Sequence, residues 1–267
     1  MVETHFYLRS AQVFEDLRGQ VAIVTGGARG LGYSMATGLT AQGVDVVLLD
    51  LLENVVQSAS TLESKSGQRV IGIPVDVTSE AELKLAFDSV NSEIGSPTLL
   101  INAAGITIWE ESLLGSKESW SKVIDINLTG TYLTCQAFAR GCKANSHSGS
   151  IVNISSMSGS IVNIPQNQTS YNTSKAGVDM LTKSLAIEWA PLGIRVNAVA
   201  PGYFLSDMTR QFTDANPELA AQWRNLIPMG RMGEPSDLDG LVTLLCSSAS
   251  SYLTGQSIII DGGYTAI

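Results

Sequence analysis

The sequence predicts an α/β protein built on one doubly wound parallel sheet, and two observations carry that prediction. Short runs of β-branched and other apolar residues alternate along the chain with longer amphipathic segments. These runs are almost continuously apolar, which is typical of strands that helices cover on both faces. No internal repeat and no Pro- or Gly-rich linker divides the 267 residues. We therefore expect a single domain over residues 19–267, preceded by a short N-terminal arm at residues 1–18.

Seven strands and six helical regions are expected in alternation. The strands are expected at residues 20–25, 44–50, 70–75, 98–102, 150–155, 195–200 and 257–260. The helices are expected at residues 31–42, 53–65, 79–94, 116–144, 171–190 and 235–248. Residues 203–234 interrupt this rhythm, because they carry large apolar side chains without a strand. An insertion after the C-terminal end of a strand is where a substrate loop would lie.

Composition and charge exclude several classes of function. The chain has 16 Lys and Arg against 25 Asp and Glu, and its net charge of −9 disfavours nucleic acid and anionic lipid as partners. His5 and His147 are the only histidines, so no metal site and no catalytic histidine is expected. Three unpaired cysteines and the lack of a signal peptide or long apolar run predict a cytoplasmic protein without a membrane segment.

A glycine-rich turn joins the first strand to the first helix. Residues 25–32 read Thr-Gly-Gly-Ala-Arg-Gly-Leu-Gly. Glycines permit a tight turn and a close backbone approach, and a helix N-terminus offers free N–H groups to a pyrophosphate. The turn predicts a dinucleotide site whose contacts come from Gly26, Arg29, Gly30, Leu31 and Gly32.

Asp50 ends the second strand, 18 residues after Gly32, and favours NAD over NADP. A carboxylate at this position can bond both ribose hydroxyls of NAD and repels a 2′-phosphate. Arg29 is the opposing signal, but Leu51 gives it no cationic partner. Asp76, after the third strand, is expected to hold the adenine amino group; the alternative is that it caps the next helix.

Tyr171 and Lys175 are four residues apart in a predicted helix, so their side chains share one face. A phenol has a reference pKa near 10, and a neighbouring ammonium together with an oxidised nicotinamide would lower that pKa. A chance pair of this kind is common on helices. Ser156 at the end of the fifth strand and Asn127, where a long helical region is interrupted, give the pair a catalytic context.

Taken in order, these motifs resemble the classical short-chain dehydrogenase/reductase family over roughly residues 18 to 267. The motifs that carry the resemblance are residues 25–32, 76–77, 102–105, 127, 154–156, 171–175, 195–202 and 261–263. Residues 157–171 and 228–235 look like those of the polyol and ketose reductase branch, such as galactitol and arabinitol dehydrogenases.

The resemblance implies a Rossmann-type sheet of order 3-2-1-4-5-6-7, a homotetramer and direct hydride transfer to or from NAD. It assigns Tyr171 as general acid/base, Lys175 as the group that lowers the pKa of Tyr171, Ser156 as the partner of the substrate oxygen, and Asn127 as the holder of a water. It further assigns to cofactor binding, besides the glycine turn and Asp50, the residues Leu51, Asp76, Val77, Asn102, Ala103, Gly105, Tyr171, Lys175, Pro201, Phe204 and Ser206.

The substrate is left open between a polyol and a bulky aryl or amino alcohol. Ser155, Ser156 and Ser158 compete for the serine role, with Ser156 favoured and Ser158 expected to line the pocket. Further pocket candidates are Trp109, Gln166, Tyr203, Met208 and Trp223, of which the aromatic residues would suit an aryl alcohol. Two other functions are weighed: an NADPH-dependent 3-oxoacyl thioester reductase, which Asp50 disfavours, and a non-catalytic NAD-sensing protein, which the retained Tyr171 and Lys175 disfavour.

Overall fold

The computed structural model describes residues 14–267, apart from the side chains of Asp207, Met208, Gln211 and Phe212. Its centre is a seven-stranded parallel sheet of order β3-β2-β1-β4-β5-β6-β7, as the family resemblance implied. The strands are β1 Val21–Thr25, β2 Asp45–Asp50, β3 Val70–Pro74, β4 Leu99–Asn102, β5 Gly149–Ile154, β6 Ile194–Pro201 and β7 Ser257–Ile260.

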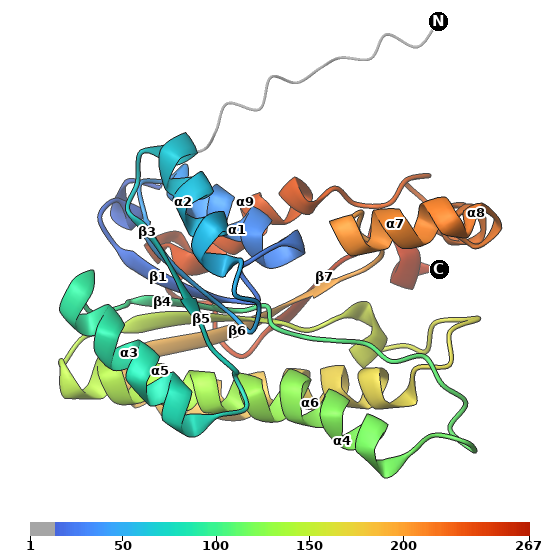
Figure 1. Ribbon diagram of the computed structural model, residues 1–267, viewed down its shortest axis with the longest axis horizontal. Helices are drawn as coiled ribbons and strands as arrows, with labels where there is room; N and C mark the ends of the chain where they lie inside the picture. The colour runs from blue at the N-terminus through green and yellow to red at the C-terminus, as the bar shows by residue number, and fades with distance from the viewer. Residues whose placement is uncertain (1–13) are drawn as a thin grey trace, which may run out of the picture.

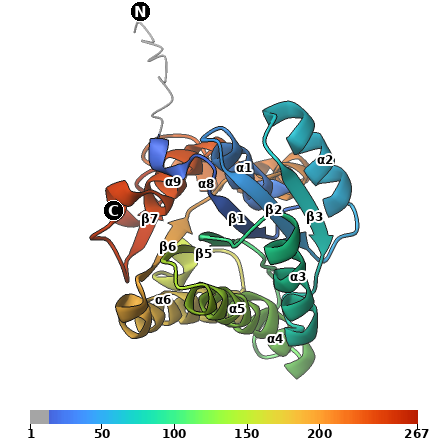
Figure 2. The ribbon, with the colours of Figure 1, turned by 90° about the vertical axis from the view of Figure 1, so that its left-hand side faces the viewer.

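Helices cover both faces of this sheet, which explains why the strands are mostly apolar (Figures 1 and 2). The upper layer in Figure 1 holds α1 Gly30–Thr40, α2 Val55–Ser66 and α9 Asp239–Cys246. The lower layer holds α3 Glu80–Glu93, α5 Gly130–Ala144 and α6 Thr169–Trp189. Two apolar clusters fill the spaces between the sheet and the two layers, with Met35 and Leu39 in one and Phe87 and Phe138 in the other. None of the helices within residues 14–267 is both long enough and apolar enough to cross a membrane.

The helix predicted over residues 116–144 is divided. It forms α4 Lys117–Ile124, a π-helical segment at Asp125–Thr129, and then α5. The predicted interruption at Asn127 therefore lies inside the π segment. The helix predicted from residue 235 is likewise a short 3₁₀ turn, Pro235–Leu238, followed by α9.

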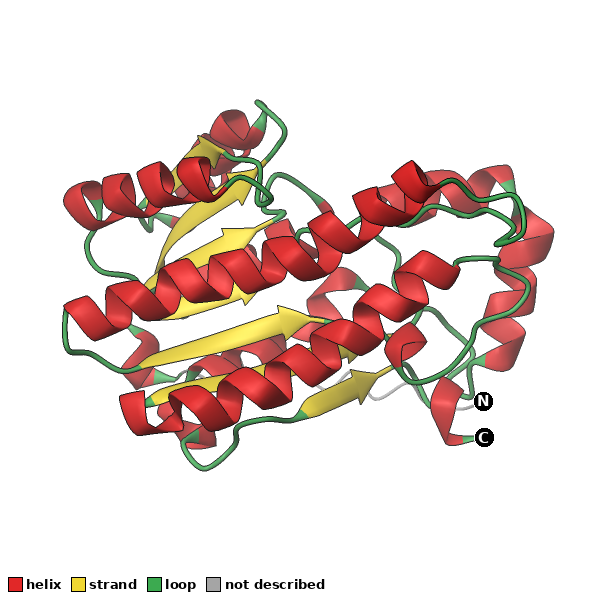
Figure 3. Ribbon diagram, turned by 90° about the horizontal axis from the view of Figure 1, so that it is seen from below, coloured by secondary structure: helices red, strands yellow, loops and turns green. Residues whose placement is uncertain are grey.

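Residues 203–234 contain two helices that the sequence analysis did not predict, α7 Asp207–Ala215 and α8 Pro217–Leu226. Both project beyond the C-terminal ends of the strands (Figure 1), and in Figure 3 the arrowheads of the strands point toward this end. The loops that end β4 and β5 reach the same end of the molecule. Of the predicted N-terminal arm, residues 1–13 lie outside the described residues, and Leu17 is fully buried in the core.

Candidate active site

A cavity of about 790 Å³ opens at the C-terminal ends of the strands, where the order of the sheet reverses between β1 and β4. Most of the residues predicted for cofactor and substrate line it. They are Gly26, Arg29, Gly30, Leu31, Gly32, Asp50, Leu51, Asp76, Val77, Ala103, Gly105, Trp109, Ser156, Ser158, Gln166, Tyr171, Lys175, Pro201, Tyr203, Phe204 and Ser206.

Two predicted residues, Asn102 and Asn127, do not line this cavity in the described structure. The Asn102 side chain is buried beneath the cavity and donates to Asn153 Oδ1 at 2.9 Å, so it joins β4 to β5. Asn127 is fully buried, next to the wall. The side chain of Met208 lies outside the described residues. The contacts of Asn102 and Met208 with cofactor or substrate stay predictions.

The glycine-rich turn is tightly folded and can take few other residues. A Cβ on Gly32 would lie 2.2 Å from the carbonyl oxygen of Gly26, and one on Gly26, whose φ is +64°, would lie 2.8 Å from the backbone of Ala104. Helix α1 begins at Gly30, and no side chain caps its N-terminus. The turn therefore leaves room for a phosphate beside backbone N–H groups that no capping side chain occupies.

Asp50 holds this turn from the adjacent strand. Its Oδ2 accepts from the amide of Ala28 and its Oδ1 from the amide of Leu52, both at 3.0 Å. The carboxylate is thereby fixed on the cavity wall, whereas the guanidinium of Arg29 is exposed to solvent. Asp50 and Arg29 thus bring opposite charges to the lining of the same cavity.

Asp76 lies two residues after the end of β3. Its Oδ1 accepts from the amide and the hydroxyl of Thr78, at 2.9 and 2.7 Å. The N-cap of α3 is Ser79, whose hydroxyl accepts from the amide of Glu82. Asp76 therefore does not cap the helix, which removes the alternative considered above, and it remains on the cavity wall beside Val77.

Tyr171, Ser156 and Lys175 come together at the centre of the cavity. Helix α6 begins at Thr169, so Tyr171 and Lys175 lie in its first two turns, and Ser156 follows the end of β5. The Lys175 Nζ lies 5.6 Å from the centre of the Tyr171 ring and donates to the carbonyl of Ile154 at 2.7 Å. Burial raises the pKa of Tyr171, while its hydrogen bond with Ser156 lowers that pKa.

The net shift of the Tyr171 pKa within the protein is upward. The predicted lowering, which combines the ammonium of Lys175 with an oxidised nicotinamide, stays a prediction. Burial also lowers the pKa of Lys175 from 10.5 to about 8, against the opposing attraction of Asp179. Desolvation disfavours the charged form of both groups.

Asn127 and Lys175 both lie next to the loop that follows β4. Its amide group donates to the Ile106 carbonyl and to Ser174 Oγ, and its Oδ1 accepts from the Ile106 amide at 2.8 Å. A Cβ on Gly105 would lie 3.3 Å from Asn127 Oδ1 and 3.6 Å from Lys175 Nζ. Asn127 therefore fixes the loop beside the ammonium; its predicted role in holding a water stays a prediction.

The three candidate serines have different surroundings. Ser155 Oγ donates to the backbone carbonyl of Lys175 at 3.1 Å, and Ser158 Oγ donates to Asn163 Oδ1 at 2.6 Å. Ser156 is the one that bonds Tyr171, and its Oγ also accepts from the amide of Ser158. These contacts favour Ser156 over the other two for the position next to the reacting oxygen.

The remaining end of the cavity combines carboxamides with aromatic rings. Tyr203 stacks on Trp223 with 4.5 Å between ring centres, and Trp109 meets Trp223 edge-on at 6.3 Å. The hydroxyl of Tyr203 accepts from Gln166 Nε2 at 2.9 Å and from Asn163 Nδ2 at 3.3 Å. Sequence reasoning named Gln166 but missed Asn163 and Gln168, although the amide-rich segment 163–168 was a usable signal.

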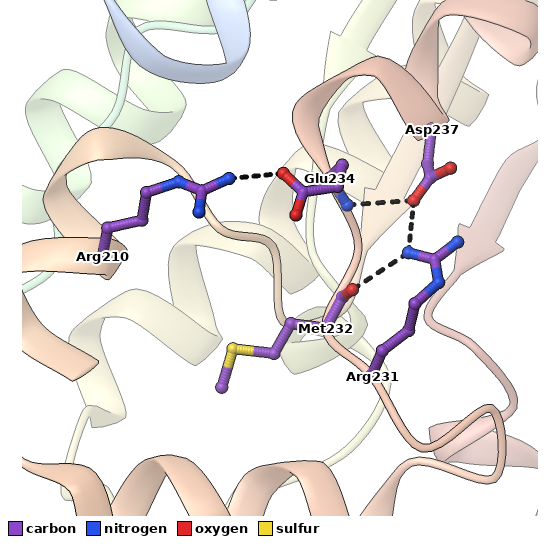
Figure 4. Close-up of polar contacts among 5 residues, drawn as sticks. All are labelled: Arg210, Arg231, Met232, Glu234 and Asp237. Carbon is purple, nitrogen blue, oxygen red and sulfur yellow. Dashed lines mark hydrogen bonds and ion pairs between the residues drawn. The ribbon is translucent and has the colours of Figure 1, made fainter. Parts of the chain in front are cut away.

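Two exposed ion pairs lie along the substrate loop, and one of them involves the projecting helix α7. Figure 4 shows Arg210 of α7 paired with Glu234, and Arg231 paired with Asp237 in the turn before α9. Asp237 also accepts from the amide of Glu234 at 2.9 Å. The substrate loop is thus connected to the layer of helices above the sheet, at the side of the cavity that carries Phe204 and Ser206.

Known proteins match almost the whole chain. A family model described as "Enoyl-(Acyl carrier protein) reductase" matches residues 26–265. Galactitol 2-dehydrogenase (L-tagatose-forming) of Cereibacter sphaeroides is 38% identical over 93% of this chain and 96% of its own. D-arabinitol 2-dehydrogenase of Candida tropicalis is 38% identical, with 93% of each chain covered. A 3-oxoacyl-[acyl-carrier-protein] reductase of Aquifex aeolicus is 37% identical over 92% of this chain and 98% of its own.

Solved structures match equally well. A short-chain type dehydrogenase/reductase from Mycobacterium marinum has a TM-score of 0.89 and 37% identity, covering 97% of this chain and 100% of the other. A putative 2-deoxy-D-gluconate 3-dehydrogenase from Agrobacterium tumefaciens with bound NADP has a TM-score of 0.86 and 34% identity, covering 95% and 99% of the two chains.

The fold and the cavity define an oxidoreductase with a site for a nicotinamide dinucleotide. The sequence and structure matches make the assignment specific: the chain belongs to the short-chain dehydrogenase/reductase family, in the branch that includes polyol dehydrogenases.

Proposed function

We propose that this protein is an NAD(H)-dependent oxidoreductase that interconverts a secondary alcohol of a polyol and the corresponding ketose. The observation that carries the proposal is the cavity in which Tyr171, Ser156 and Lys175 meet beyond the glycine-rich turn. The turn fits a dinucleotide because Gly32 and Gly26 leave no room for side chains and the N-terminus of α1 has no side-chain cap.

The nicotinamide, when bound, accepts or supplies the hydride, and the protein handles the proton. Tyr171 exchanges a proton between its hydroxyl and the substrate oxygen, and Ser156 hydrogen-bonds the same oxygen. Burial raises the pKa of Tyr171, so alcohol oxidation needs nearby positive charge to favour the phenolate. Lys175, beside the ring, supplies part of that charge, an oxidised nicotinamide would add to it, and we expect Asn127 to connect the lysine with a water.

NAD is favoured over NADP by the carboxylate of Asp50. That carboxylate is fixed on the wall by two backbone amides, and it would meet the extra phosphate of NADP. Adenine would lie against Asp76 and Val77, and the nicotinamide carboxamide against Ser206, with Pro201 and Phe204 beside it. NADP is the alternative cofactor, and it is bound in the Agrobacterium structure.

A polyol suits the substrate end better than an aryl alcohol. Asn163, Gln166 and Gln168 place three carboxamides on the wall next to Ser158, which is the donor and acceptor chemistry that several hydroxyls need. The aromatic side chains that suggested an aryl substrate are largely occupied by one another, since Tyr203 stacks on Trp223. Relatives named for galactitol and arabinitol support the same choice.

The decisive experiment compares wild type with Tyr171→Phe, measuring NAD reduction against polyols, aryl alcohols, amino alcohols and 3-hydroxyacyl thioesters. We expect polyol oxidation in wild type, a loss of at least about a thousandfold in the variant, and unchanged NADH binding by fluorescence. Activity retained in Tyr171→Phe would refute the mechanism. Tight NADH binding without oxidation of any alcohol would point to a non-catalytic sensor.

A 3-oxoacyl thioester reductase is the second candidate, because Arg29 borders the cavity and the family model and the Aquifex relative carry acyl-carrier names. Initial rates of 3-oxoacyl thioester reduction with NADH and NADPH decide between the two functions. Faster reduction with NADPH than any polyol reaction with NAD would favour the reductase.

We further propose a homotetramer that forms through α5 and α6. Exposed apolar side chains lie on both helices: Tyr132 on α5, and Met180 and Ile187 on α6. Light scattering on the purified protein tests this: a mass of four chains is expected, and a monomer at micromolar concentration would refute it.

A further inference from the structure

One carboxamide on the cavity wall has a buried acceptor without a donor. Gln166 is 8% exposed, and its Oε1 has no hydrogen-bond partner within the described residues 14–267. Leaving a buried amide oxygen unbonded costs free energy of the order of a lost hydrogen bond. Since Gln166 lines the same cavity as Tyr171, a bound molecule can supply the missing donor.

The surrounding hydrogen bonds show which end of the Gln166 amide the protein uses and which end it leaves unbonded. Gln168 Nε2 donates to Ser158 Oγ, and Ser158 Oγ donates to Asn163 Oδ1, which leaves Asn163 Nδ2 to donate to Tyr203. Gln166 Nε2 donates to the same Tyr203 hydroxyl at 2.9 Å. Its nitrogen is thus committed to the protein, and its oxygen is the free acceptor.

The aromatic cluster makes this arrangement rigid. The Tyr203 ring is stacked on Trp223, and Tyr264 meets it edge-on with 5.5 Å between ring centres. A hydrogen bond also joins the phenols of Tyr203 and Tyr264. A rigid acceptor is selective, because it cannot turn away to bond water when the ligand lacks the matching donor.

We propose that Gln166 is a specificity-determining residue whose Oε1 accepts a hydrogen bond from a substrate hydroxyl other than the one that reacts. The inference rests on the proposed function and deepens it: the site would select substrates with at least two hydroxyl or carbonyl oxygens over simple secondary alcohols. Ser156 and Tyr171 bind the reacting oxygen, and Gln166 reads a second position along the carbon chain.

Gln166→Met tests this, because methionine keeps the length of the side chain but accepts hydrogen bonds poorly. Its kcat/KM is compared with wild type on a ketose that the wild type reduces, on a series of analogues that each lack one hydroxyl, and on 2-hexanone. We expect a loss of about tenfold or more on the parent ketose and almost none on 2-hexanone. For the analogue that lacks the hydroxyl bound by Gln166, the kcat/KM of wild type should be about tenfold below that for the parent ketose. The Gln166→Met variant should reduce this analogue with the same kcat/KM as wild type.

Two further variants separate recognition from structural damage. Tyr203→Phe keeps the stacked ring but removes the hydroxyl that holds Gln166, so it should weaken discrimination at the same substrate hydroxyl. Gln136→Met makes the same change on α5, outside the cavity lining, and should leave every ratio unchanged. Melting temperature and NADH affinity are measured for each variant to verify folding.

The outcomes distinguish this inference from the proposed function. A uniform loss on all ketones, 2-hexanone included, or no change on any, would overturn the role of Gln166 while the polyol assignment stands. If wild type reduces no ketose at all yet binds NADH, the proposed function fails first. If wild type reduces 2-hexanone as efficiently as the parent ketose, the second contact does not exist.

Discussion

Replacing Lys175 with methionine should abolish catalysis and yet make the protein more stable at neutral pH. Lys175 is 5% exposed, and burial lowers its pKa from the ordinary 10.5 to about 8. At pH 7 this difference corresponds to about 3 kcal/mol by which folding is disfavoured, because the lysine must be charged inside the fold. The variant also loses the hydrogen bond to the Ile154 carbonyl, worth about 1 kcal/mol.

The net expectation is a gain of about 2 kcal/mol at pH 7, or roughly 5 °C in melting temperature for a domain of this size. The pH dependence gives the sharper test. Between about 8 and 10.5 the unfolded lysine still holds its proton while the folded one has released it, so the stability of wild type rises with pH in this range. The difference between the two proteins should almost vanish by pH 10.

Thermal unfolding of both proteins, followed by circular dichroism at pH 7 and pH 10, measures this difference. Groups that titrate over the range and lie far from Lys175 are common to both proteins and cancel in the comparison. The neighbouring Tyr171 stays largely protonated over the range, because burial raises its pKa above the ordinary value of 10. A variant that melts below wild type at pH 7, or a difference that does not depend on pH, would show that burial of the ammonium does not destabilise the fold.

Four other changes have expected outcomes. Asp50→Ser should raise the ratio of kcat/KM with NADP to that with NAD by at least about tenfold; an unchanged ratio would mean that the carboxylate does not select the cofactor. Gly32→Ala should lower the unfolding free energy by about 1–3 kcal/mol and weaken NADH binding, because its Cβ would meet a carbonyl oxygen at 2.2 Å. Gly141→Ala on α5 is the control, because no atom lies within 4 Å of the added Cβ, and it should raise the unfolding free energy by up to about 1 kcal/mol. Chemical denaturation measures both variants, and equal changes in their unfolding free energies would contradict this account. A double-mutant cycle on the half-exposed Arg210–Glu234 pair should give a coupling below about 1 kcal/mol that falls with added salt; a larger, salt-independent value would argue against a surface pair.

The fold was predictable because its strands are mostly apolar and helices separate most of them along the chain. The order of the strands came from the resemblance, and the structure confirms it. The π segment and the two helices of the substrate loop were not predicted. Pro217 in the first turn of α8 was a usable signal for one of those helices. The division of the helix at Asp125–Thr129 depends on packing that a local pattern does not contain.

The site was predictable where the contact is local and unpredictable where it is not. Tyr171 and Lys175 share a helix face, so their proximity followed from spacing alone. The direction of the Tyr171 pKa shift depends on how deeply α6 buries the phenol, which only the tertiary structure determines. The hydrogen bond between Asn163 and Tyr203 joins residues 40 positions apart, and neither side chain alone indicates it.

The π segment that carries Asn127 has a consequence for how this region tolerates insertions and deletions. A π turn holds one more residue than the α-helical turn it replaces. Deleting a single residue between Asp125 and Thr129 would restore regular geometry and turn everything after it by about 100° about the helix axis. Phe138 and Cys142, which now pack in the apolar cluster beneath the sheet, would turn toward the adjacent helices or solvent. Which face of α5 is turned toward the sheet therefore depends on the one extra residue in the π segment. The exposed loop at Leu113 and Leu114 could lose a residue without rotating a helix.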